Sequence, residues 1–354
     1  MQTLHFITPS HFATSDEVFG LMRLAQKSLG GEHRTIVLGS QKEATWLRQR
    51  GIKVLGSIDG ILDVSNTLSS RLRRMVMRTM CSTSSTCIAW GWHAASTLST
   101  VSSSIDSFAY VDEIDEGYEF GKNNVQVIPS GWSCSRKLVS IGIDEQFVAE
   151  PLLGVEPTSM VVDRATVFDA INIPTTTHVI PIVGRLSSWQ EILSMLFRLD
   201  SANREFVFVL PDGYNYSSEL RSAVKQRGLS RKLIDLPPAL RSADVLANAT
   251  CAWAPEPSSY DESHSVLEVV TAAWGDMPVA ANVQHPVADN PCFGAQIAWA
   301  ASELEICGWI LDIIQGNSSL LQKSAEVTMS VRSIASPSRF IEGMQLRMST
   351  QSVS

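Results

Sequence analysis

The sequence predicts an α/β protein of two domains, each with a parallel sheet covered by helices. With 354 residues, the chain is longer than one ordinary hydrophobic core accommodates. Short apolar runs alternate with longer stretches of helical periodicity, and a new series begins after residue 159. We therefore expect one domain over residues 1–157, a second over 158–335, and a C-terminal helix and tail over 336–354.

Composition and charge exclude several classes of protein. The chain is 44% hydrophobic and 18% charged, as in soluble globular proteins, and its net charge of −8 argues against nucleic acid as a partner. Its six cysteines form no C-x-x-C pair and no zinc-like spacing, so they read as buried thiols in a reducing compartment. The start "MQTLHFITPSHF" lacks a signal-peptide pattern, and no run approaches 18 apolar residues. We expect a cytoplasmic protein.

The first half alternates strands with helices that end at glycine. Helices are expected over 16–30 and 41–51, ending at Gly30-Gly31 and at Gly51. The step between residues 56 and 86 gives no clear pattern. The expected strands are 4–9, 34–39, 52–56, the start of 86–96 (which then enters a helix), 108–113 and 125–130.

The second half repeats this alternation. A helix is expected over 217–228, and a last one over 336–351 after the Ser-Pro break. The expected strands are 178–186, 205–213, 232–236, 250–256, 277–282 and 295–300. Both halves are therefore interpreted as Rossmann-like domains, with a ligand in the cleft between the carboxyl ends of their strands.

Several motifs of the second half fall in a familiar order: "GRLSSWQ" at 184–190, "PDG" at 211–213 and "VLEVVTAAWGDMPVAAN" at 266–282. Together they resemble the donor-nucleotide domain of GT-B glycosyltransferases, most closely retaining family 4 (group 1). The first half resembles the acceptor domain more loosely, through 125–157. The resemblance implies two Rossmann-like domains facing across a cleft, with the C-terminal helix crossing back to the N-domain.

The resemblance also implies an activity. It is hexosyl transfer from a nucleotide-sugar to a glycan or lipid-linked acceptor in polysaccharide biosynthesis, with retention of anomeric configuration. The nucleotide-sugar is then a co-substrate, and no cofactor or metal is expected, because cationic side chains can stabilise the leaving diphosphate.

Candidate donor-binding residues follow from the matching motifs. Glu268 matches the second acid of the family's Glu-(seven residues)-Glu motif, which binds ribose, although an acid on the solvent face of a helix is the alternative. Arg185 matches the phosphate-binding Arg, whose planar fork suits diphosphate, or else is a surface Arg at a strand end. Asp212 and Gly213 lie in the family's second turn. Gln190 stands where the family usually carries Lys, so it supplies no charge.

The first acid of the motif should lie at position 260, which is Tyr260. Asp261 and Glu262 are close enough to take its catalytic role after a one-residue loop deletion, or they are solvated loop acids. Ser263 or Ser265 is expected to cap a helix whose backbone amides bind the phosphates.

Two further candidates lie in the first half. His93 matches a family His that faces the reacting sugar, a catalytic role, or is a satisfied His at a helix start. The stretch "RLRRMVMR" places Arg71, Arg73, Arg74 and Arg78 amid apolar residues. Such a helix is either a peripheral contact with an anionic membrane or a solvated face.

Two other functions remain open. A catalytically inactive GT-B homologue, acting as a nucleotide-binding or scaffold protein, is favoured by Gln190, by Tyr260 and by the lack of a Gly pair in "SHFATSDEVFG" after the first strand. A GT-B sugar-phosphate enzyme such as an epimerase is the third interpretation. The sequence does not give the donor sugar, the base, the acceptor or the oligomeric state.

Overall fold

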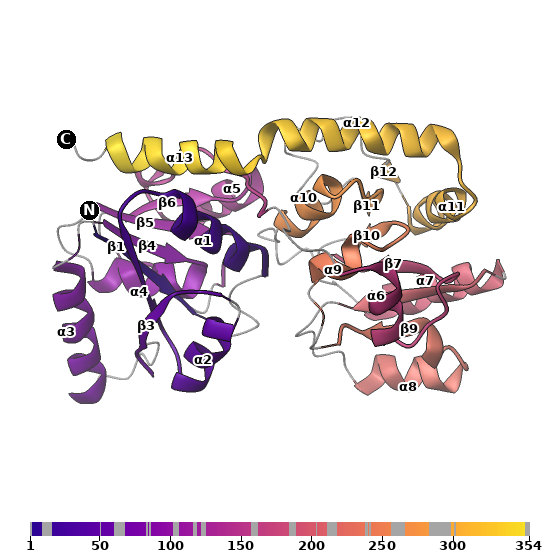
Figure 1. Ribbon diagram of the computed structural model, residues 1–354, viewed down its shortest axis with the longest axis horizontal. Helices are drawn as coiled ribbons and strands as arrows, with labels where there is room; N and C mark the ends of the chain where they lie inside the picture. The colour runs from indigo at the N-terminus through magenta and orange to yellow at the C-terminus, as the bar shows by residue number, and fades with distance from the viewer. Residues whose placement is uncertain are drawn as a thin grey trace. The chain divides into compact units, whose positions relative to one another are not determined.

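The computed structural model (Figure 1) describes residues 2–8, 16–49, 51–59, 68–82, 84, 86–101, 106–115, 119–121, 125–156, 162–183, 189–202, 204–210, 218–237, 240, 242–255, 266–282, 299–300 and 302–350. The chain divides into two compact units. Unit 1 comprises Met1–Glu156 together with Ala335–Ser354, and unit 2 comprises Pro157–Ile334.

Unit 1 is a parallel sheet with helices between its strands. The described strands have the order β3-β2-β1-β4-β5-β6, and every neighbouring pair is parallel. The order reverses between β1 and β4, which makes this the topological switch point of the sheet. The elements are β1 (Gln2–Ile7), α1 (Asp16–Ser28), β2 (Glu32–Val37), α2 (Gln41–Gln49), β3 (Val54–Ser57), α3 (Leu68–Ser82), β4 (Thr86–Trp90), α4 (Trp92–Val101), β5 (Asp106–Val111), β6 (Val125–Pro129), α5 (Trp132–Ser140), the 3-10 helix η1 (Glu145–Phe147) and α13 (Pro337–Thr350).

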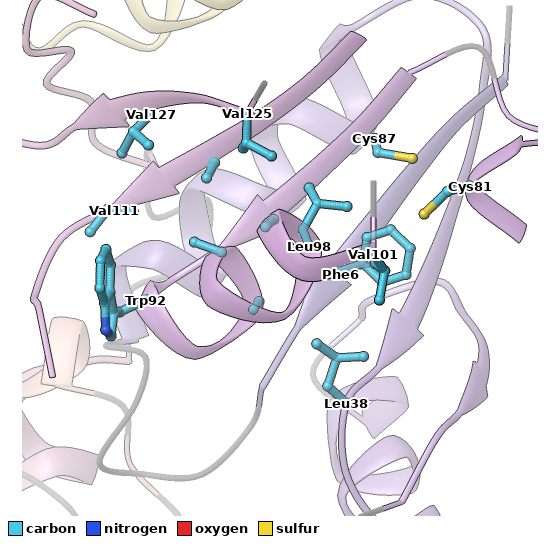
Figure 2. Packing of buried hydrophobic residues seen from close by; sticks show 14 of the residues in the cluster. Phe6, Leu38, Cys81, Cys87, Trp92, Leu98, Val101, Val111, Val125 and Val127 are labelled. Atoms are coloured by element: carbon cyan, nitrogen blue, oxygen red, sulfur yellow. The ribbon is translucent and has the colours of Figure 1, made fainter. Parts of the chain in front are cut away.

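One hydrophobic core of unit 1 lies between the sheet and α4. Figure 2 shows Leu98 and Val101 of α4 together with Val125 and Val127 of β6 and other members of this buried cluster. Helix α4 is buried along nearly its whole length although it is rich in Ser and Thr. Its hydroxyls bond carbonyls: Thr97 Oγ1 donates to His93 O (2.9 Å), for example. Satisfying these groups internally lets a polar helix lie inside the domain.

Two thiols in this cluster lie side by side (Figure 2). Cys81 at the end of α3 and Cys87 in β4 are both buried and free. The hydrogen bond from Cys81 and burial raise the pKa of Cys87 well above its ordinary value, so it remains a thiol at neutral pH. The other free cysteines in the described part of the chain, Cys134, Cys251 and Cys307, are buried as well.

A chain of polar rings crosses the strands of unit 1. Trp90 Nε1 donates to His5 Nδ1 (2.9 Å), His5 Nε2 lies 2.9 Å from His33 Nδ1, and His33 Nε2 lies 2.8 Å from Leu29 O. Indole nitrogen only donates and a carbonyl only accepts, so the two ends fix both histidines as neutral Nε2–H tautomers. Burial, and secondarily His33, lower the pKa of His5 to about 3.

The hydrogen-bonded rings of Trp90, His5 and His33 predict that unit 1 loses stability in acid. Between pH ~6.5 and about 3 the unfolded state binds a proton at His5 that the folded state does not, so stability falls as pH falls, by roughly 1 kcal/mol per pH unit. His5→Asn keeps an acceptor for Trp90 but removes the titrating ring. Urea unfolding of unit 1 at pH 7.5, 6 and 5 should show a shallower pH dependence in His5→Asn than in the wild type; parallel slopes would contradict the assignment.

Helix α13 completes unit 1 by close backbone packing. A Cβ on Gly154 would lie 2.6 Å from Phe340 of α13, and one on Gly343 would lie 2.6 Å from Leu152. Arg347 Nη2 donates to Glu150 O (2.9 Å). The predicted helix after the Ser-Pro break is therefore present, with Pro337 as its first residue, where a missing N–H is tolerated.

We expect Gly154→Ala to destabilise unit 1 by about 1–3 kcal/mol, because the added methyl overlaps the buried Phe340 ring. Gly30→Ala is the matched control, since its Cβ meets nothing within 4 Å. Thermal and urea midpoints for both variants test the contact. Equal midpoints for Gly154→Ala and Gly30→Ala would show that α13 does not pack tightly on this segment.

Unit 2 repeats the strand order of unit 1. Its described strands form the parallel groups β7-β8-β9 and β10-β11-β12, and a parallel bridge between Ile182 and Trp253 connects β7 to β10. The combined order β9-β8-β7-β10-β11-β12 reverses between β7 and β10. The elements are α6 (Arg164–Ala170), β7 (His178–Pro181), α7 (Trp189–Ser201), β8 (Phe206–Leu210), α8 (Ser218–Gln226), the 3-10 helix η2 (Ser230–Lys232), β9 (Leu233–Asp235), α9 (Ser242–Leu246), β10 (Ala252–Ala254), α10 (Leu267–Trp274), β11 (Val279–Asn282), β12 (Trp299–Ala300), α11 (Glu303–Ile314) and α12 (Ser318–Ile334).

Both faces of the unit 2 sheet are buried. Successive strand residues alternate between two clusters, with Ile180 and Phe208 in one and Val179 and Val207 in the other. Helix α12 contacts α10 through a hydrogen bond that Thr328 Oγ1 donates to the carbonyl oxygen of Ala273 (2.9 Å). No helix in the described ranges is long and apolar enough to cross a membrane.

Candidate functional site

The switch point of unit 2 brings together the starts of two helices. Beyond the end of β7, Val183 N donates to Trp253 O of β10 (2.9 Å), so β7 and β10 run side by side up to their carboxyl ends. After these ends the chain enters α7 and α10, whose second residues are Gln190 and Glu268. In open α/β sheets, ligands bind in the crevice beside this position.

Glu268 lies in the first turn of an otherwise apolar helix. Leu267, Val269 and Val270 are fully buried, whereas Glu268 is half-buried, on the same stripe of α10 as Thr271. A carboxylate in the first turn is favoured by the helix dipole. This placement fits the predicted ribose contact, and it equally fits an acid on the less buried side of the helix.

Gln190 is exposed in the first turn of α7. It brings no charge to the position where the resembling family carries Lys. The remaining predicted donor-site and catalytic residues lie outside the described residues: Arg185, Asp212, Gly213, Asp261, Glu262, Ser263 and Ser265.

The switch point of unit 1 places His93 next to an acid that sequence reasoning had not selected. β4 ends at Trp90, Gly91 turns the chain with a positive φ of 81°, and α4 begins at Trp92. His93 Nε2 lies 2.9 Å from Asp115 Oδ2, and Trp92 Nε1 donates to the carbonyl oxygen of Asp115 (2.6 Å). Asp115 follows β5, the neighbour of β4, so a signal existed in the acids of "YVDEID" directly after an expected strand.

A second unpredicted acid lies at the same edge. Asp112 directly follows β5, is 3% exposed, and accepts a hydrogen bond from Ser130 Oγ (3.3 Å) beyond β6. Burial is the largest cause, and Asp112 the second, that raises the pKa of Tyr110 and that of Cys134 well above their ordinary values. Asp112 and Asp115 thus both lie beyond the carboxyl end of β5, one buried and the other half-exposed.

Helix α3 has an apolar strip that faces outward. Leu72, Met75 and Val76 are 51%, 58% and 49% exposed and share one face by their i, i+3, i+4 spacing. The opposite face carries the buried Met77 and Cys81. Three arginines border the strip, with Arg71 and Arg78 along one side and Arg73 along the other. Arg74 lies nearer the buried face, and the helix contains no acid.

Solved structures resemble the chain over its full length. A glycosyltransferase from Rickettsia africae ESF-5 has a TM-score of 0.70 at 12% identity, covering 100% of this chain and 99% of that chain. HepE of Anabaena in complex with UDP-glucose also reaches 0.70 at 12% identity, covering 98% and 99%. The lipopolysaccharide outer core galactosyltransferase WaaB gives 0.59 at 11% identity, covering 99% of each.

The chain has the GT-B fold. A UDP-GlcNAc 2-epimerase from Neisseria meningitidis shares it, with a TM-score of 0.57 at 11% identity over 99% of this chain and 100% of that chain. No model of a protein family matches the sequence, and no curated protein matches it. The fold is common to transferases and epimerases, so the residues at the two switch points have to distinguish them.

Metal ligands do not gather in the part of the chain that the structure describes. No group of three or more His, Cys, Asp or Glu is placed there to hold an ion. The described residues at the two sheet edges offer hydrogen bonding by carboxylates and by the amides of helix N-termini.

Proposed function

We propose that this chain is a glycosyltransferase that moves a hexosyl group from a nucleotide-sugar to a glycan or glycolipid acceptor, with retention of anomeric configuration. One observation carries the proposal: Glu268 lies in the first turn of α10 at the switch point of unit 2, where open α/β sheets bind nucleotides. HepE, with the same fold, binds UDP and UDP-glucose.

In this proposal Glu268 accepts hydrogen bonds from the two ribose hydroxyls. Arg185 pairs with the diphosphate through its planar fork, and amides at the N-terminus of α7 add partial positive charge. Gln190 contributes a hydrogen bond without charge, so Arg185 carries more of the stabilisation of the leaving group. Asp212, Gly213, Ser263 and Ser265 complete the donor site, and Asp261 or Glu262 replaces the family's first acid.

Nucleotide binding tests this assignment directly. Calorimetry with UDP, GDP and ADP should show binding of at least one, and Glu268→Gln should weaken it roughly 10- to 100-fold, the value of a charge-assisted hydrogen bond. Glu326→Gln on α12 is the matched control, an exposed acid of the same unit. Absence of heat with all three nucleotides, or equal affinity in Glu268→Gln, would contradict the donor site.

The inactive alternative makes a different prediction in the same assay. A nucleotide-binding scaffold would bind UDP through Glu268 but would neither hydrolyse nor transfer from the matching sugar nucleotide. The exposed, uncharged Gln190 favours this alternative. Formation of a sugar epimerised at a ring carbon other than the anomeric carbon would favour the epimerase interpretation instead.

The proposal includes contact between α3 and an anionic lipid surface, on which a lipid-linked acceptor would reside. Exposed Leu72, Met75 and Val76 supply apolar area, and the bordering arginines supply charge complementary to lipid headgroups. Among the described residues, neither Arg71 nor Arg78 has an ion-pair partner. Three large apolar side chains exposed within two turns favour this contact over a merely solvated face.

Vesicle sedimentation tests this surface. The protein should bind vesicles of phosphatidylcholine with 30% phosphatidylglycerol, more weakly at high salt, and Arg71→Gln with Arg78→Gln should lower affinity roughly 10- to 30-fold, at ~1 kcal/mol per charge. Met75→Ser should also weaken binding, while Leu346→Ser on α13, which removes another exposed apolar side chain (64% exposed), should not. Equal binding to neutral vesicles, or equal effects of Met75→Ser and Leu346→Ser, would remove α3 from the proposal.

A further inference from the structure

Cys81 and Cys87 point their sulfur atoms toward each other inside unit 1 (Figure 2). Cys81 comes from the last turn of α3 and Cys87 from the start of β4, and a hydrogen bond links the two thiols. They are 2% and 0% exposed. A disulfide forms only between cysteines whose side chains converge, so this pair meets the first requirement for one.

The other buried cysteines of the described ranges have different neighbours. Cys134 donates its thiol hydrogen to the carbonyl oxygen of Val111 (3.6 Å). Burial raises the pKa of Cys251 to about 12 without a contribution from a second thiol. Cys134 belongs to the same unit as the pair and is equally buried, so it provides an internal control for the reactivity of Cys81 and Cys87.

The two thiols of the pair differ in how firmly the chain holds them. Strand β4 lies inside the sheet, and Cys87 is paired in register with β1 on one side and with β5 on the other. Cys81 lies at a helix end whose Thr79 and Ser82 are exposed, and local opening is easiest at such ends. When this turn opens, Cys81 reaches solvent while Cys87 stays in the sheet.

We propose that Cys81 and Cys87 form a redox-active dithiol, in which Cys81 reacts with hydrogen peroxide and Cys87 then closes a disulfide that fixes the end of α3 to β4. This device goes beyond the proposed transferase and does not depend on it. Cys87 lies near the amino end of β4, whereas the donor site is assigned to carboxyl ends of strands in unit 2.

The reaction takes two steps. The Cys81 thiolate attacks one oxygen of the peroxide, the O–O bond breaks to give a sulfenic acid, and the hydroxide released takes up the proton lost by Cys81 to form water. After the turn closes, the Cys87 sulfur attacks the Cys81 sulfur, the S–O bond breaks, and the oxygen leaves as water with the Cys87 proton. The cysteines lose two electrons in total, and these reduce the peroxide to water.

The hydrogen bond between the thiols favours the same order of attack. It lowers the pKa of Cys81 and, together with burial, raises the pKa of Cys87 well above its ordinary value. The thiolate is the nucleophile in thiol chemistry, so Cys81 is the better attacking group and Cys87 the resolving thiol.

Peroxide treatment of the full chain tests the disulfide. After denaturation, alkylation and peptide mass spectrometry, the Cys81 and Cys87 peptides should be found linked with the loss of two hydrogens, while Cys134 remains open to alkylation. Dithiothreitol should restore both thiols. Oxidation of Cys134 before any link between Cys81 and Cys87 is detected would overturn the proposal.

Single substitutions test the order of attack. Cys87→Ser keeps a hydrogen-bond donor beside Cys81 but cannot close the disulfide, so peroxide should leave a sulfenic acid at Cys81 that dimedone traps. Cys81→Ser should leave Cys87 unmodified over the same time. Thermal midpoints of the untreated variants check that each is folded. Equal trapping at Cys87 in Cys81→Ser and at Cys81 in Cys87→Ser would contradict the assigned roles.

Two methionines of α3 test the route of access. Met77 is buried on the inner face of the helix, whereas Met75 is 58% exposed on the outer face. Met77→Ala weakens the docking of α3, so the disulfide should form at least roughly fivefold faster than in wild type, while Met75→Ala should leave the rate within about twofold. Equal rates in the two variants would show that the opening of α3 does not admit the oxidant.

The oxidised protein tests whether the bond fits the folded chain. Closing the short loop between the two cysteines restricts the unfolded state, so oxidation should raise the thermal midpoint of unit 1 by roughly 5 °C, and dithiothreitol should reverse the rise. An unchanged or lower midpoint in the oxidised protein would overturn the claim that the disulfide fixes α3 to β4.

Discussion

The burial of parallel strands on both faces is the constraint from which the arrangement of functional groups follows. Side chains inside the sheets, such as those of β4 and β8, are fully enclosed and have no access to a ligand. Polar groups that meet a ligand must therefore lie beyond the carboxyl ends of the strands. In both units the strand order reverses once, and there the crossover helices diverge and leave room beside the strand ends.

The fold was predictable because its strands are short apolar runs bounded by glycine, proline or polar residues. The α/β class and the GT-B architecture are confirmed by the full-length similarity to GT-B structures. Helix α3 was predicted only through its arginine-rich stretch 71–78; its bounds, Leu68–Ser82, were not predicted, because the step between residues 56 and 86 gave no clear pattern. The strand predicted over 178–186 was placed too long, since β7 ends at Pro181; residues 184–186 of that prediction, and residues 211–213 of the strand predicted over 205–213, lie outside the described residues.

The candidate site was only partly accessible to sequence reasoning. Glu268 and His93 were selected from family motifs, and their roles remain predictions. Asp115 could not be found in this way, because its significance comes from a partner 22 positions earlier that topology brings within hydrogen-bonding distance. Adjacent parallel strands are joined through a helix, so residues at neighbouring strand ends are far apart in sequence. Such pairs require the strand order before they can be recognised.

The edges of the two units differ in chemistry. In unit 1, Asp112 and Asp115 follow β5 and are held by the side chains of Ser130 and His93. In unit 2, the half-buried Glu191 and Glu268 lie in the first turns of α7 and α10, where the helix dipoles favour negative groups.

The packing of α13 against Gly154 and Leu152 has a consequence for biosynthesis. Unit 1 is assembled from two segments separated by the whole of unit 2, so about 180 residues must be synthesised before its last helix is available. During that interval the surface that receives Phe340, including Leu21, is uncovered. The nascent chain thus exposes an apolar surface that its own final helix later covers. Unit 1 can complete its fold only after unit 2 has been translated.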